Sequence, residues 1–134
     1  MAALSRFLLG GYVPNALRSE LDAEEILILE ERCHGTLTYR DFRSPHRRAS
    51  LKKQGMRAAV VVTSRRVVIC RRSTTLLDVA FDDPRFGALE WKEDRPDRFC
   101  VGFDVARFHD GWSGRLEIRL TTERTPEILA RVRS

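Results

Sequence analysis

The sequence has few cysteines, no long apolar run and no clear secretory signal. Its three cysteines are isolated and odd in number, which argues against a disulfide scaffold or a zinc site and suits a reducing compartment. No apolar run approaches the roughly 20 residues that a membrane-spanning helix needs. No convincing cleavage site follows the short apolar segment near the start. We therefore expect a cytoplasmic protein, and 134 residues suit one domain.

Sequence motifs for catalysis are also absent. The chain contains no G-x-S-x-G, no phosphate-cradling glycine loop and no H-E-x-x-H. Cys33 and His34 are neighbours, and neighbouring strand residues point to opposite faces, which argues against a thiol–imidazole pair. Asp82 and Asp83 precede Pro84 in a pattern that is typical of a turn and lacks the spacing of a calcium loop. The sequence thus predicts no enzyme, no cofactor and no metal site.

Acidic residues are missing from the stretch between Arg43 and Arg72, which holds ten Lys or Arg residues. The whole chain has a net charge of +5, so the remainder is net negative. Such a block is a candidate contact surface for phosphate or anionic lipid. Its first part, residues 43–57, contains Pro45 and Gly55 and few large apolar residues, which predicts a mobile loop. The candidate ligand-binding residues are the six basic ones of this loop: Arg43, Arg47, Arg48, Lys52, Lys53 and Arg57.

A basic loop of this kind has two interpretations. It either collects anionic groups or is a solvated segment that only aids solubility. The other four arginines of the block stand at the turn and the end of a predicted hairpin, whose valines indicate a buried position. The loop is therefore the candidate binding element, and the hairpin is mainly an indication of the fold.

Apolar and polar residues alternate in short segments through most of the chain, as in antiparallel strands with one buried face. An apolar run at 56–63, a polar turn at 63–66 and a second run at 67–70 predict a β-hairpin. The segments 26–32 and 36–42 predict two strands, with Gly35 in the turn between them. Further strands are expected around 77–81, 89–92, 99–105 and 115–120. Trp91 alternates with polar neighbours and is expected in the core, whereas Trp112 lies in a glycine-flanked loop.

Helical patterns occur near both ends. Residues 16–23 predict a short helix, and a second one follows Thr125 as its N-cap, with Pro126 in the first helical position. We predict a mainly β (α+β) fold, a curved antiparallel sheet or barrel of seven or eight strands capped by the C-terminal helix. The single domain spans residues 1–134, with 1–14 as a loose N-terminal arm and 22–133 as the core.

The segment from Met56 to Ile69 contains an apolar strand that ends in Thr, a polar turn that carries Arg, and a second apolar strand. This arrangement, with residues 24–27, 76–81 and 125–133 around it, resembles the pleckstrin-homology-like (PH-like) superfold, in particular its bacterial and GRAM-type branches. The resemblance covers residues 22–133 and implies a binding module that is not an enzyme. Lipid-binding members of that superfold use a Lys in the first strand, where this chain has Arg40.

The resemblance and the basic loop predict a module that engages a protein partner or an anionic membrane surface, where the protein would be peripheral. The alternative is a nucleic-acid-binding domain that uses the same loop, because phosphate contacts require clustered Arg and Lys. The loop contains no aromatic residue on which bases would stack. The sequence leaves the formation of a homo-oligomer open, since sheet edges in such folds often pair.

Overall fold

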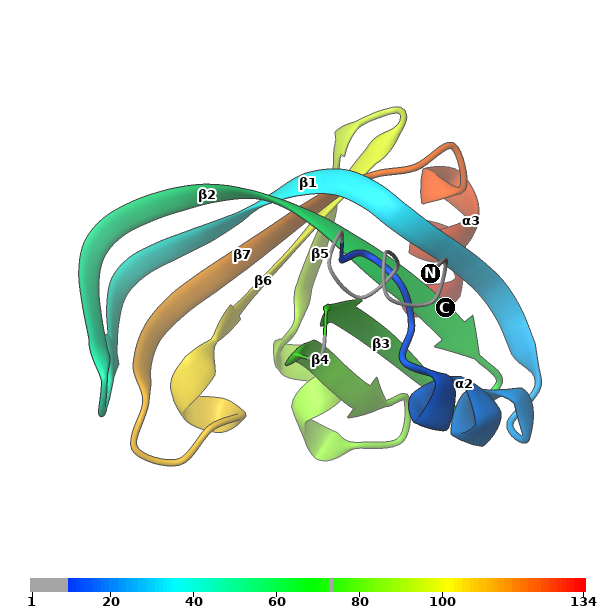
Figure 1. The fold of residues 1–134 in the computed structure, drawn as a ribbon, viewed down its shortest axis with the longest axis horizontal. Coiled ribbons are helices and arrows are strands. Elements are labelled where there is room, and N and C mark those ends of the chain that lie inside the picture. Colours follow the sequence, from blue (N-terminus) through cyan, green and yellow to red (C-terminus); the bar gives the residue numbers. More distant parts are fainter. Residues whose placement is uncertain (1–9, 73) are drawn as a thin grey trace, which may run out of the picture.

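The computed structural model describes residues 10–72 and 74–134. Within them, seven antiparallel strands form one curved sheet in the order β4-β3-β2-β1-β7-β6-β5 (Figure 1). The strands are β1 (Ile26–Ser44), β2 (Arg47–Thr63), β3 (Arg66–Arg71), β4 (Thr74–Ala80), β5 (Glu90–Arg95), β6 (Arg98–Asp104) and β7 (Ser113–Thr121). The helical elements are α2 (Asn15–Asp22), α3 (Thr125–Val132) and the short 3-10 turns η1 (Pro84–Ala88) and η2 (Val105–Arg107). The predicted mainly β sheet with a C-terminal helix is confirmed.

β1 is one strand of 19 residues, so the prediction of two strands separated by a turn at Gly35 was wrong. Gly35 instead lies inside the ladder, opposite Met56 of β2 and Leu120 of β7. A Cβ at this position would overlap the carbonyl oxygen of Arg119. The glycine is therefore required by the close approach of β7. The irregularity that the sequence pattern detected is a register shift between Glu30 and Cys33.

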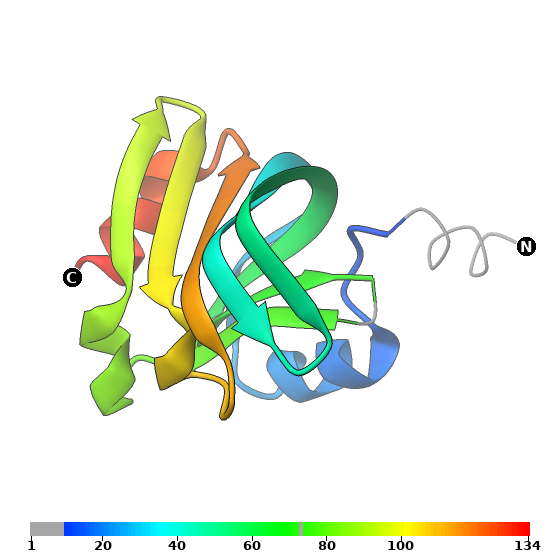
Figure 2. The ribbon, with the colours of Figure 1, turned by 90° about the vertical axis from the view of Figure 1, so that its left-hand side faces the viewer.

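The predicted mobile loop at 43–57 was also wrong. These residues form the end of β1 and the first 11 of the 17 residues of β2, and the two strands pair from Ser44 and Arg47 inward. Only Pro45 and His46 connect the strands. This segment, called the basic hairpin below, curls away from the sheet and forms one end of the molecule (Figures 1 and 2). Pairing with β1 supplies its backbone hydrogen bonds, which composition alone does not reveal.

The predicted hairpin at 56–70 is confirmed, with Val62 opposite Val67 beside the turn. Its apolar run is uninterrupted because both faces of β2 are covered here. Val60 and Val62 face the main core, whereas Ala59 and Val61 face a second cluster. That cluster is closed by Leu21 of α2 and by Val13 of the segment before α2.

The helices lie close to their predicted positions. α2 matches the predicted helix at 16–23 to within one residue at each end. α3 packs Ile128, Leu129 and Val132 into the main core, as the spacing predicts. Thr125 is the first helical residue and not the N-cap, because Arg124 occupies that place. Residues 1–9 of the predicted arm lie outside the described residues, whereas 10–14 pack on β1, where Arg32 N donates to Gly11 O.

Two glycines of β1 and β2 provide a matched test of the close approach at β7. We expect Gly35→Ala to lower the free energy of unfolding by about 3 kcal/mol, because the added methyl group must displace backbone. Gly55→Ala meets no atom within 4 Å and should change it by less than about 0.5 kcal/mol. Urea unfolding of both variants measures the difference. Equal effects at the two positions would contradict this role for Gly35.

Candidate functional site

The basic hairpin distributes its charged side chains over both faces. Arg43 and Arg48 lie opposite each other and line a shallow pocket that also contains Asp41. On the other side, the Arg47 guanidinium lies 5.6 Å from the Tyr39 ring centroid and donates a hydrogen bond of 3.2 Å to the Tyr39 hydroxyl. Five of the six candidate residues are exposed, and Arg57 is half-buried.

The remaining candidates lie further along β2. Lys52 is opposite Tyr39, and Lys53 is opposite Thr38. Lys53 and Arg40 line a second shallow pocket on the outer face of the sheet. Arg57 is further inward, where an added Cβ on Gly11 would lie 3.2 Å from the Arg57 Cβ. The six predicted residues therefore share one hairpin but do not converge on one pocket.

Ion pairing separates one arginine of the basic block from the rest. Arg66 contacts Glu20 at 2.8 Å, Glu24 at 2.8 Å and Asp78 at 2.9 Å. Burial alone would lower the pKa of Arg66, but the hydrogen bonds to Glu20 and Glu24 and the nearby Asp78 raise it above its ordinary value. Arg66 thus joins α2, the entry to β1, and β4. Its charge is neutralised and serves the fold.

The other nine basic residues between 43 and 72 form no ion pair with a described carboxylate. Arginines on the outer face of β7 differ from them. There Glu117 contacts Arg40 at 3.0 Å, Arg115 at 3.3 Å and Arg119 at 3.6 Å. Gly102 leaves the space that Arg115 crosses to reach Glu90 on β5. Positive charge is thus compensated on the sheet face and left uncompensated on the basic hairpin.

The Glu117 cluster predicts a specific pH dependence of stability. Burial would raise the pKa of Glu117, but its hydrogen bonds to Arg40 and Arg115 lower it below the ordinary 4.5. Its carboxylate therefore stabilises the fold above the unfolded-state pKa, and this contribution is lost as the pH falls through the folded-state pKa. We expect Glu117→Gln to lower the free energy of unfolding by about 2 kcal/mol at neutral pH.

The comparison is made by urea unfolding from neutral pH down to about pH 3, where the difference between the wild type and Glu117→Gln should shrink. Glu123→Gln is the matched control, because Glu123 is exposed and makes no described side-chain hydrogen bond. A difference that stays constant with pH would show that Glu117 does not act through its charge.

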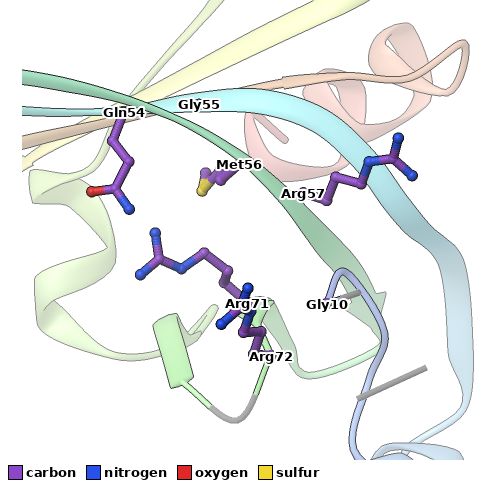
Figure 3. A pocket seen from close by; sticks show the side chains of 7 residues that line it. All are labelled: Gly10, Gln54, Gly55, Met56, Arg57, Arg71 and Arg72. Carbon is purple, nitrogen blue, oxygen red and sulfur yellow. The ribbon is translucent and has the colours of Figure 1, made fainter. Parts of the chain in front are cut away.

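A further cluster of positive charge lies where β2 passes the end of β3. A pocket of about 210 Å³ is lined by Gly10, Gln54, Gly55, Met56, Arg57, Arg71 and Arg72 (Figure 3). Its described lining contains three arginines and no carboxylate. Gln54 and Arg71 point toward each other, whereas Arg57 points away from them. Sequence reasoning missed this arginine pocket, because only the pairing of β2 with β3 places Arg71 and Arg72 beside residues 54–57 of β2.

The cysteines are all buried thiols. Burial, with a smaller contribution from Glu30, raises the pKa of Cys33 to about 12. Burial likewise raises the pKa of Cys70 to about 11, with Glu31 contributing, and it raises the pKa of Cys100. His34, beside Cys33, is exposed on the opposite face of β1.

Thiolate is the reactive form of cysteine, so these pKa values predict very slow alkylation of the native protein. We expect iodoacetamide near pH 8 to modify none of the three cysteines in the folded state and all of them in urea, as intact mass would show. Native labelling at the rate of a small free thiol would contradict the described burial.

The two tryptophans are half-buried against the main core. The Trp91 ring lies 5.9 Å from that of Phe99. Trp112 stacks on His109 at 4.3 Å and meets the edge of Phe42 at 5.6 Å. Trp112, predicted to lie in a loop, therefore helps to close the core beside the basic hairpin.

Neither a group of metal-ligating side chains nor a membrane-spanning helix is found in the part of the chain that the structure describes. No three His, Cys, Asp or Glu side chains of residues 10–72 and 74–134 are grouped so that they could hold a metal ion. No helix in the same residues is long and apolar enough to cross a bilayer. Comparison with known proteins gives no match to a family model, a curated protein or a solved structure.

Proposed function

We propose that this chain is a non-catalytic binding module of PH-like architecture that docks on an anionic membrane surface through the basic hairpin. The strand order, the curved sheet and the closing α3 support the architecture. One observation carries the binding proposal. Six basic side chains without a described carboxylate partner are gathered on a hairpin that forms one end of the molecule.

The distribution of these charges over both faces favours a membrane over a single bound ion. A charged bilayer attracts every basic group within a Debye length of about 8–10 Å, so the groups need not meet in one pocket. Each Lys or Arg near such a surface contributes about 1 kcal/mol. A two-stranded ribbon keeps side chains of both faces within that range.

Leu51 adds an apolar contact at the same place. It is 64% exposed, and among the described residues only Leu27 is also a large exposed hydrophobic side chain. Lys52 and Lys53 follow it directly. Isolated exposure of one leucine is too little for a stable protein interface. Beside two lysines it suits insertion at the level of lipid headgroups.

Nucleic-acid binding through the basic hairpin has less support. Single-stranded nucleic acid is normally held by bases stacked on exposed aromatic rings as well as by phosphate contacts. The aromatic residues on this part of β1, Tyr39 and Phe42, are only 6% and 5% exposed. They serve the core, so neither ring is exposed for base stacking.

Co-sedimentation with vesicles tests the membrane proposal. We expect the protein to pellet with phosphatidylcholine vesicles that contain about 30% phosphatidylserine and not with pure phosphatidylcholine. Binding should weaken as salt is raised. Reversing two charges in K52E/K53E should weaken it at least about tenfold, since each charge contributes about 1 kcal/mol.

Arg107→Glu is the control, because Arg107 is an exposed arginine on η2, outside the hairpin. It should bind like the wild type. Equal and negligible pelleting with both vesicle types would refute the proposal. Salt-sensitive binding of single-stranded DNA or RNA, measured by fluorescence anisotropy without vesicle binding, would support the nucleic-acid alternative instead.

A further inference from the structure

The side of β2 that faces away from β1 is largely open. β1 pairs with β2 along its whole length, whereas β3 pairs with it only from Ala59 to Val62. Figure 2 shows β1 between the far part of β2 and β7. Among the described residues, no other strand pairs with residues 47–58 on that side. This segment is called the open edge below.

Backbone groups of the open edge are available for hydrogen bonding. In an antiparallel ladder, alternate residues direct their N–H and C=O groups to the two sides of the strand. The described backbone bonds outside the strand ladders include none from residues 47–58. About half of the backbone groups in this segment therefore have no partner among residues 10–72 and 74–134 and can bind an added strand.

The arginine pocket lies at the inner end of the open edge. Cys70 is the last residue of β3 that pairs with β2, and β3 ends one residue later at Arg71. A strand that extended the line of β3 along β2 would begin at this pocket. Ala58 is paired with Cys33, and both belong to the main core. Met56 stands two residues before Ala58 on β2 and therefore also faces the core. Arg57 therefore projects to the other face.

The side chains around the open edge are basic on both faces. Lys52 lies on the face of Tyr39, whereas Lys53 and Arg57 lie on the opposite one. Arg71 and Arg72 stand at the inner end, and no carboxylate lines the described pocket there. An occupant with acidic side chains on both faces of its backbone would match this pattern of charge.

We propose that an extended acidic peptide adds to the open edge as an eighth strand. Its backbone bonds to the free groups of β2, and its carboxylates face Lys53 and Arg57 on one side and Arg71 on the other. This binding is separate from membrane docking, because lipid headgroups cannot continue a backbone ladder. In this arrangement the first acidic side chain of the peptide binds in the arginine pocket.

A second copy of this chain is the wrong occupant. Two-fold pairing of two open edges would place the lysines at 52 and 53 beside those of the other copy. Like charges opposite each other destabilise strand pairs. The basic edge thus disfavours self-pairing while it accepts an acidic strand, which is how natural sheets protect an edge from aggregation.

Peptide titration followed by fluorescence anisotropy tests the proposal. The probe is a fluorescein-labelled peptide of repeating Glu-Glu-Thr-Thr, about ten residues long, which places Glu on both faces of an extended strand. The control peptide has the same sequence and charge but an N-methyl group on every backbone nitrogen, which prevents strand pairing. We expect the methylated peptide to bind at least tenfold more weakly. Equal affinities would overturn strand addition and leave only non-specific attraction between charges.

Amide hydrogen exchange supplies the second measurement on the same complex. The unmodified peptide should slow exchange within residues 47–58, and the methylated peptide should not. In R57E/R71E, affinity for the unmodified peptide should fall at least tenfold, while Arg107→Glu should be unchanged. No detectable binding at low salt, or protection confined to residues outside the open edge, would overturn the proposal.

Discussion

The whole sheet depends on β1 serving as the shared strand of two half-sheets. On one side it pairs with β2, which leads to β3 and β4, and on the other with β7, which leads to β6 and β5. The ladder with β7 begins at Gly35, where the backbone of β7 occupies the space of a side chain. The main core is therefore enclosed by one curved sheet whose two halves are joined only through β1. The same strand continues to Ser44 and carries the basic hairpin.

Burial increases along β2, so its first part serves as surface and its second part belongs to the core. Its second half is covered on both faces, by the main core and by the cluster beneath α2. Its first half is mostly exposed and carries charge. Charges that lie on packed parts of the molecule are compensated, as for Arg66 and the arginines around Glu117. The charges of the basic hairpin form no ion pair with a carboxylate of the described residues.

The sequence pattern predicted those elements whose burial is regular. The valines at 60–62, the alternation in β7, and the apolar face of α3 all follow from which faces are covered. The basic hairpin was not recognised as a pair of strands, because a strand exposed on both faces has the composition of a loop. Gly35 was misplaced because a glycine at a close contact resembles one in a turn. The arginine pocket depends on strand register, which cannot be read from composition or spacing.

The pairing of β1 with β7 also determines when the domain can be completed during synthesis. Gly35 and Leu120 are neighbours in space but are separated by most of the chain. The hairpins β1–β2 and β3–β4 are local and can form early, whereas contacts of such long separation form slowly. A growing chain thus exposes Leu37 and the second edge of β1 until β7 has left the ribosome. The order of synthesis makes β7, followed by α3 with its core residues, the elements whose arrival ends the aggregation-prone stage.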